Sequence, residues 1–147
     1  MDPYTAGMFP SNPYRSKRPV RGRLVVVLDG RLSGRGLELI RPISRALRRG
    51  EIHELVVTAE ADAGPGTTVN QVTYLGFFEV EEGGMAVTGD SVRVDGRPVG
   101  RLGGFDETHH PNHLNLVLVG DDATGFERGL ALGDEISIGE TDEGGQR

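Results

Sequence analysis

The chain has 147 residues, of which 36% are hydrophobic and 5% aromatic, and its formal net charge is −6. This length fits one domain, and its core must rest on Val, Leu and Ile because aromatic residues are scarce. The sequence has no cysteine, which excludes disulfides and thiolate metal sites. It has no apolar run near the roughly 20 residues of a membrane span, which excludes membrane insertion. It also has no secretory signal pattern, and together these features favour the cytoplasm.

Residues 1–19 contain four prolines and no periodicity, which predicts an irregular proline-rich arm. The short apolar run RGRLVVVLDG at 21–30 is closed by Asp-Gly and predicts a buried first strand. We expect residues 20–140 to form a single domain and residues 141–147 to be a frayed tail.

The segment LSGRGLELIRPISRALRRG at 32–50 predicts the only helix of the chain. Pro42 suits its first turn, Ile43 and Leu47 would share one face, and Gly50 would end it.

The rest of the sequence has the period-two alternation and turn residues of strands. We expect strands within residues 53–62, 68–80, 90–102, 113–122 and 134–139.

Two local signals refine this strand pattern. Gly76 is the natural bend point of the long segment 68–80, and Asp95-Gly96 suits the tight turn of a hairpin. About seven short strands and one helix predict a mainly β protein, a small closed or half-closed β-barrel with the helix at one end. A β-sandwich is the rival architecture.

The segment Pro-Asn-His-Leu-Asn-Leu-Val-Leu at 111–118 resembles the P-G-T-L-N-x-x-L segment of the archaeal CTP-dependent riboflavin kinases, which are small barrels. His113 stands where that family has a metal-binding threonine. The resemblance covers eight residues and supports barrel architecture alone. No family is identified across the whole chain.

Three of the four histidines lie within five positions of the segment FDETHHPNHLN at 105–115. A histidine titrates near neutral pH, so one of them in a barrel mouth could move protons, with a neighbouring carboxylate fixing its tautomer. The candidate catalytic residues are His109, His110, His113, Asp106 and Glu107. The alternative is a polar turn exposed to water.

A metal site is a second interpretation of the same segment. Pro111 prevents a helix from placing His109 and His113 on one face, so two histidines and one acid are the more plausible ligand set. The candidate ligands of a divalent metal are His110, His113 and Asp106. No nucleotide cofactor is expected, because no phosphate-binding loop is present.

Further polar residues are candidates for substrate binding. Arg21 and Arg23 alternate on one face of the first strand and could grip an anion, or pair with acids of the second half. A polar set in the long strand, together with one residue of the later strand, could face a cavity or solvent: Asn70, Gln71, Thr73, Tyr74 and Asn115.

Charge is divided unevenly along the chain. Residues 1–50 hold eleven Lys and Arg against three acids, whereas residues 51–147 hold five against nineteen. Opposed charges suggest an anion-binding face or contacts between subunits of a homo-oligomer, unless both surfaces are simply solvated. Nucleic acid is not an expected partner, because the basic half offers aromatic residues only in the arm.

The leading hypothesis is a small cytoplasmic enzyme of the lyase, isomerase or cyclase type, acting by histidine acid/base chemistry, with or without a metal, on a small anionic metabolite in the barrel mouth. The alternative is a non-catalytic barrel that binds a ligand or organises a complex. Convergence of Gln71, Thr73 and the histidines on one cavity would favour the enzyme. A barrel filled with aliphatic side chains would favour the alternative.

Overall fold

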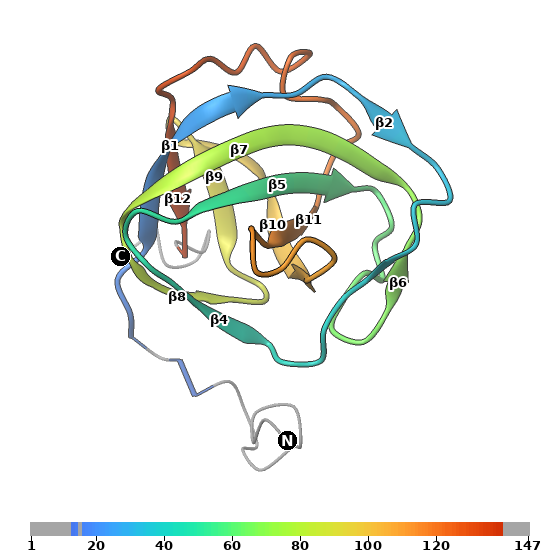
Figure 1. Cartoon of the computed structure of the whole chain (residues 1–147), viewed down its shortest axis with the longest axis horizontal. Coiled ribbons are helices and arrows are strands. Elements are labelled where there is room, and N and C mark those ends of the chain that lie inside the picture. The colour runs from blue at the N-terminus through green and yellow to red at the C-terminus, as the bar shows by residue number, and fades with distance from the viewer. Residues whose placement is uncertain (1–12, 15, 140–147) are drawn as a thin grey trace.

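A computed structural model describes residues 13–14 and 16–139, and in these residues the chain forms twelve strands and no helix (Figure 1). Most of the expected arm and all of the tail at 141–147 lie outside the described residues. The strands are β1 (Val20–Val27), β2 (Arg31–Leu32), β3 (Leu37–Glu38), β4 (Ser44–Leu47), β5 (Ile52–Thr58), β6 (Thr68–Val69), β7 (Val72–Glu82), β8 (Gly84–Val87), β9 (Ser91–Val94), β10 (Arg97–Asp106), β11 (Asn115–Val119) and β12 (Glu135–Ile138).

Seven of these strands form a closed ring. The largest sheet has the order β1-β12-β9-β10-β11-β5-β7-β2, and a further pairing of β1 with β7 joins its two sides. All neighbours are antiparallel except β5 and β11, which run parallel. The predicted mainly β class is confirmed, and the closed ring fits the barrel alternative with about seven strands.

The helix predicted at 32–50 is wrong. This segment contains the end of β2, the short strand β3 and all of β4, which pairs antiparallel with β8. Gly34 and Gly36 have φ of 67° and 70°, which no helix accommodates. Leu37 and Leu39 are both buried, so the apolar period here is two, the period of a strand.

The bend expected at Gly76 and the tight turn expected at Asp95-Gly96 are both present in the structure. Beside Gly76 the pairing of β7 shifts register against both β1 and β5, and a Cβ at Gly76 would lie 2.2 Å from the carbonyl oxygen of Val26. Asp95 and Gly96 connect β9 and β10 with φ of 49° and 79°, as a tight primed turn requires. Glycine at position 76 therefore lets the longest strand bend along the ring.

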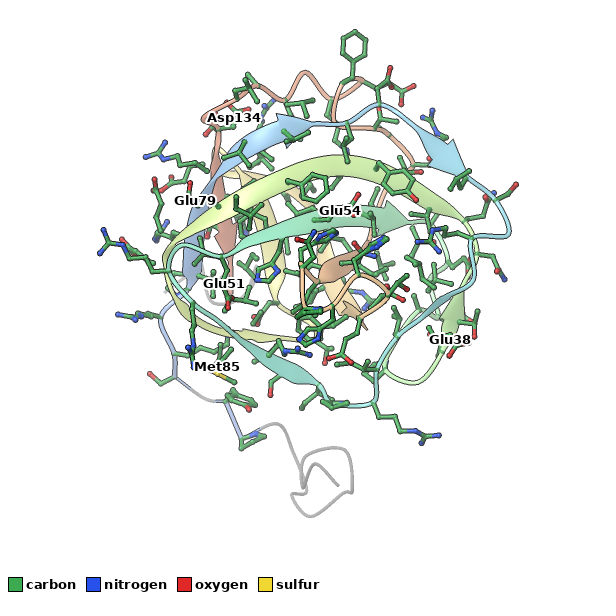
Figure 2. The ribbon with its side chains drawn as sticks, viewed as in Figure 1. Glu38, Glu51, Glu54, Glu79, Met85 and Asp134 are labelled. Atoms are coloured by element: carbon green, nitrogen blue, oxygen red, sulfur yellow. The ribbon has the colours of Figure 1, made fainter. Side chains whose placement is uncertain are left out.

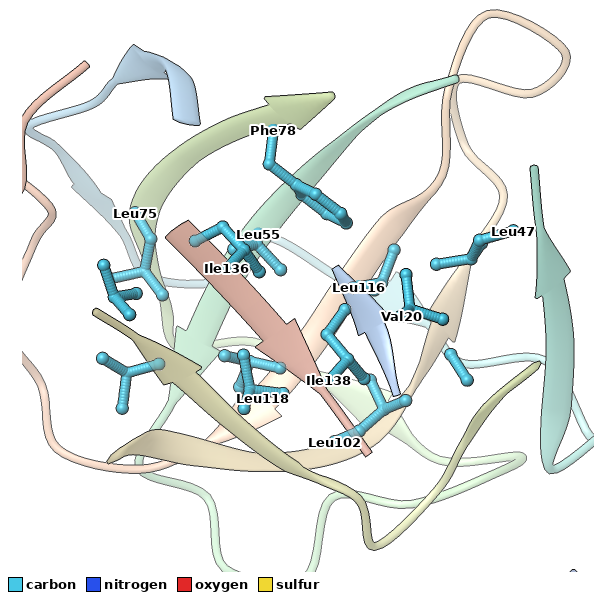
Figure 3. Packing of buried hydrophobic residues seen from close by; sticks show 14 of the residues in the cluster. Val20, Leu47, Leu55, Leu75, Phe78, Leu102, Leu116, Leu118, Ile136 and Ile138 are labelled. Carbon is cyan, nitrogen blue, oxygen red and sulfur yellow. The ribbon is translucent and has the colours of Figure 1, made fainter. Parts of the chain in front are cut away.

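The interior of the ring is filled by apolar side chains (Figure 3). Its largest fully buried members come from strands all around the ring, among them Leu24, Leu55, Leu75, Phe78, Leu102, Phe105, Leu116, Leu118, Ile136 and Ile138. The core of the described residues is therefore apolar, which leaves the mouth and the outside of the ring as the places where a substrate could bind.

A second apolar cluster covers the outer face of β5 and β11. Alternation along β5 places Leu55 and Val57 in the inner core and Val56 in this outer cluster, where β3 and β6 contribute Leu37 and Val69. Strand β5 is therefore buried on both faces, and a polar side chain on it needs a specific partner. No helix of the described residues is long and apolar enough to cross a membrane.

Candidate functional site

A pocket of about 470 Å³ lies beside the start of β5, between this strand, β7 and the loop 107–113, which we call the histidine loop. Glu51, just before β5, and Glu54, within it, are labelled in Figure 2 near this loop. The residues that line the pocket are Gly50, Glu51, Ile52, His53, Phe77, Pro111, Asn112 and His113.

His53 is buried and uses both ring nitrogens. Its Nδ1 accepts a hydrogen bond from the backbone N–H of Leu114 at 3.0 Å, so the neutral ring carries its proton on Nε2. Nε2 then donates to Oε1 of Glu51 at 3.0 Å. His53 therefore joins β5 to the chain that follows the histidine loop, and neither nitrogen is left for a substrate.

Glu51 is held in its ionised form. Burial alone would raise the pKa of Glu51, but hydrogen bonds from the backbone N–H of Arg48 and from His53 outweigh it and lower the pKa below 4.5. The Glu51 side chain is 41% exposed, so it also presents negative charge to the pocket.

His113 lies at the wall of the pocket with most of its ring buried. The ring stacks on His109 with centroids 5.0 Å apart and meets the edge of Phe77 at 5.1 Å. Nδ1 is 2.9 Å from Nδ2 of Asn112, whereas Nε2 is buried, has no hydrogen-bond partner and lies 3.4 Å from Oε1 of Glu54. Burial lowers the pKa of His113, and the charge of His109 lowers it further.

Glu54 belongs to a row of buried polar side chains that crosses three strands. The parallel register places Glu54 of β5 beside Asn115 of β11, and the antiparallel register places Asn115 beside Asp106 of β10. These residues are 7%, 3% and 2% exposed. Burial raises the pKa of Glu54, although His109 and Arg35 act against the rise.

Asp106 anchors one end of this row. Its carboxylate accepts hydrogen bonds from the N–H of Glu38 at 3.2 Å, the N–H of Thr108 at 2.9 Å and Nδ2 of Asn115 at 3.1 Å. Asp106 therefore ties the start of the histidine loop to the sheet, and its oxygens are occupied by protein donors.

The structure brings only part of the predicted catalytic set together. His113 faces the pocket and His109 stacks on it, whereas His110 is exposed. Glu107 forms an ion pair with Arg45 instead of orienting a histidine. Of the candidate acids and bases, His113 is the one that combines a pocket position with a perturbed pKa.

The predicted metal ligands find no supporting arrangement. Among residues 13–14 and 16–139, no group of three or more His, Asp and Glu side chains is placed to hold a metal ion. The oxygens of Asp106 bind backbone and amide N–H groups, and His110 lies at the surface. We therefore assign no metal ligand in the histidine loop.

The predicted substrate-binding arginines lie on the outer side of β1, because they alternate with Val20 and Leu24, whose side chains belong to the inner core. Arg21 is 3.8 Å from both Glu82 and Glu135, and Arg23 is 3.4 Å from Glu81. Pairing with acids of the second half was the alternative left open by the sequence, and this is what the structure contains.

The polar strand set does not converge on the pocket either. Asn70 and Gln71 are exposed, and their N–H groups bind Glu60. Thr73 donates its hydroxyl to Asp122, and Tyr74 packs against the outer apolar cluster. Asn115 is buried in the polar row, where it contacts Asp106.

Sequence reasoning missed three residues of the site, Glu51, His53 and Glu54. The signal was present in the segment Glu-Ile-His-Glu at 51–54, where an acid and a histidine two positions apart share one face of a strand. Their importance depends on burial, which the sequence did not reveal.

The model of a family of unknown function, DUF6917, matches residues 14–139. Neither a curated protein nor a solved structure matches the chain.

Proposed function

The chain belongs to the family of unknown function DUF6917, and we propose that it is a lyase, isomerase or cyclase that uses His113 to transfer a proton of a small molecule bound beside the histidine loop. The substrate would occupy the pocket between β5, β7 and this loop instead of the interior of the ring. No metal is required for this chemistry.

One observation carries the proposal. His113 lies at the wall of a pocket, its lowered pKa keeps the ring neutral near pH 7, and the buried carboxyl group of Glu54 is 3.4 Å behind it. A neutral imidazole can accept a proton, and perturbed titratable groups in a cleft are typical of functional sites.

The charge of the pocket bears on the substrate. None of the described residues that line it is Lys or Arg, and Glu51 is ionised there. Arg21 and Arg23, the expected anion contacts, are paired with acids on β1's outer side. The proposed substrate is therefore a small molecule that need not be anionic. A cytoplasmic location and a homo-oligomeric state remain part of the proposal.

A second candidate function is non-catalytic ligand binding or complex organisation. The aliphatic filling of the ring favours it, because the polar strand set and the histidines do not share a cavity. The two functions differ in whether a bound molecule exchanges protons with solvent.

Solvent exchange tests the proposal with no need to choose one substrate in advance. Protein would be incubated in deuterated water with pooled small metabolites, and mass spectrometry would detect a molecule that gains deuterium at carbon. His113→Gln should slow this exchange by ~10²-fold or more, as expected for loss of an acid/base group. The exposed variant His110→Gln is the matched control and should exchange as fast as wild type.

Two outcomes contradict the proposal. Exchange that survives in a folded His113→Gln protein would remove His113 from the chemistry. Ligands that bind the wild-type protein tightly and never gain deuterium would favour the binding function instead.

A further inference from the structure

We propose that Glu54 is a neutral carboxylic acid in the folded protein and that its hydroxyl group completes a hydrogen-bonded row that positions His113. The inference concerns the same site and takes its catalytic meaning from the proposed function. The state of Glu54 can nevertheless be measured without substrate.

Beside Glu54 lies a buried hydrogen-bond acceptor that has no donor, the side-chain oxygen of Asn115. Oδ1 of Asn115 is buried and has no hydrogen-bond partner, and its Nδ2 donates to Asp106. Because the amide is planar, Nδ2 directed at β10 turns Oδ1 toward the other neighbour, β5. The residue beside Asn115 on β5 is Glu54. An ionised Glu54 would place two acceptors together in a buried site, whereas a protonated one supplies the missing donor.

On its other side Glu54 faces the ring of His113. The amide nitrogen of Asn112 can only donate, so Nδ1 of His113 accepts and the neutral ring carries its proton on Nε2. Nε2 faces Oε1 of Glu54 at 3.4 Å. One carboxyl oxygen can therefore accept from His113 while the other donates to Asn115. The proton on Nε2 of His113 and the proton on Glu54 thus give partners to the two buried atoms that otherwise lack them, and only Oδ1 of Asn115 depends on the protonated carboxyl group.

The surroundings of Glu54 shift its pKa in opposite directions. His109 and Arg35 favour its ionised form, whereas burial favours the neutral form. Asp106 lies beyond Asn115 in the same row. Burial dominates, since the pKa of Glu54 is raised above 4.5. Glu54 thus acts through His113 as a positioning residue. It keeps the proton on Nε2 and leaves Nδ1 as the accepting nitrogen, so a substrate proton would have to displace the hydrogen bond from the exposed amide of Asn112.

Carboxyl and imidazole NMR test this assignment directly. In protein labelled with ¹³C and ¹⁵N, the Glu54 carboxyl signal at pH 7 should be that of a protonated group, and the ¹⁵N shifts of His113 should report the Nε2–H tautomer at the same pH. Glu54→Gln should preserve this tautomer, because its amide oxygen accepts and its NH₂ group donates as the acid does.

Stability as a function of pH provides an independent readout. A group whose pKa is raised in the folded state binds its proton more tightly there, so stability is lost as pH rises from 4.5 through the folded pKa. The urea midpoint of wild type should fall across this window, and that of Glu54→Gln should lack this fall. Glu51→Gln is the matched control, because it removes a carboxylate whose pKa is lowered in the folded state. At pH values above that pKa, its urea midpoint should lie below that of wild type.

An ionised Glu54 carboxyl signal at pH 7, or an Nδ1–H tautomer of His113, would overturn the inference. So would a Glu54→Gln protein with a lower urea midpoint than wild type at pH 7. None of these results involves turnover, so each is distinguishable from failure of the proposed enzyme activity.

Discussion

His53→Leu is the most informative single test of how the site is built. Leucine has nearly the volume of histidine and suits the apolar surroundings of a side chain that is 8% exposed, so packing changes little. What is lost is the acceptor for the Leu114 N–H and the donor to Glu51. The substitution thus isolates the polar role of His53.

The magnitude follows from these two bonds. The Leu114 N–H becomes a buried donor without a partner, which costs about 1–3 kcal/mol. The bond to the half-exposed Glu51 contributes about 0.5–1 kcal/mol more. We therefore expect a loss of about 1.5–4 kcal/mol in the free energy of unfolding. At about 2–4 °C per kcal/mol for a chain of this size, the melting temperature should fall by about 3–16 °C.

Urea unfolding followed by circular dichroism measures this loss, with thermal melting as a second readout. The exposed variant His110→Leu is the matched control and should remain within about 0.5 kcal/mol of wild type. If His53→Leu were as stable as His110→Leu, the hydrogen bond to Leu114 would not hold the histidine loop as described.

Two other substitutions test the frame around the site. Gly76→Ala should lose at least about 2 kcal/mol of stability to urea, because the new Cβ would meet the Val26 carbonyl oxygen at 2.2 Å. The control Gly30→Ala places its Cβ in open space and should change this stability by less than about 0.5 kcal/mol. Equal stabilities of the two variants would contradict the tight packing at the bend. Asp106→Asn should cost about 1–3 kcal/mol, since an amide cannot accept all three of its donors, and amide exchange of Thr108 should quicken. Unchanged exchange there would show that Asp106 does not anchor the histidine loop.

The sequence was sufficient for the seven strands of the ring because their signals are local, whereas the short strands β2, β3, β4 and β8 were not predicted. The run at 21–30, the alternation along 68–80 and the Asp95-Gly96 turn each depend on neighbours in the chain. The helix at 32–50 failed because the prediction used Ile43 and Leu47 and overlooked the period of two at Leu37 and Leu39.

The site was predicted only in part because its order is not local. Glu54, Asp106 and Asn115 lie side by side through one parallel and one antiparallel pairing. Clustering of histidines pointed to the correct loop, yet the residues that tune His113 come from β5, and the parallel partner of a strand has no signature in a single sequence. Burial, which sets the pKa of Glu54, follows from the same long-range pairings.

The place of β1 in the ring has a consequence for how the chain is made. Its partners are β7 and β12, and β12 is the last strand of the described residues. At ribosomal rates of about 5–20 residues per second, roughly 5–20 s separate the synthesis of β1 from that of β12. During this interval β1 gains its β7 neighbour but not β12, so the nascent chain carries a strand edge whose backbone groups are unpaired. We expect the ring to close only after β12 has left the ribosome, and we expect chaperones that bind the open edge of β1 before that step to determine the yield of folded protein.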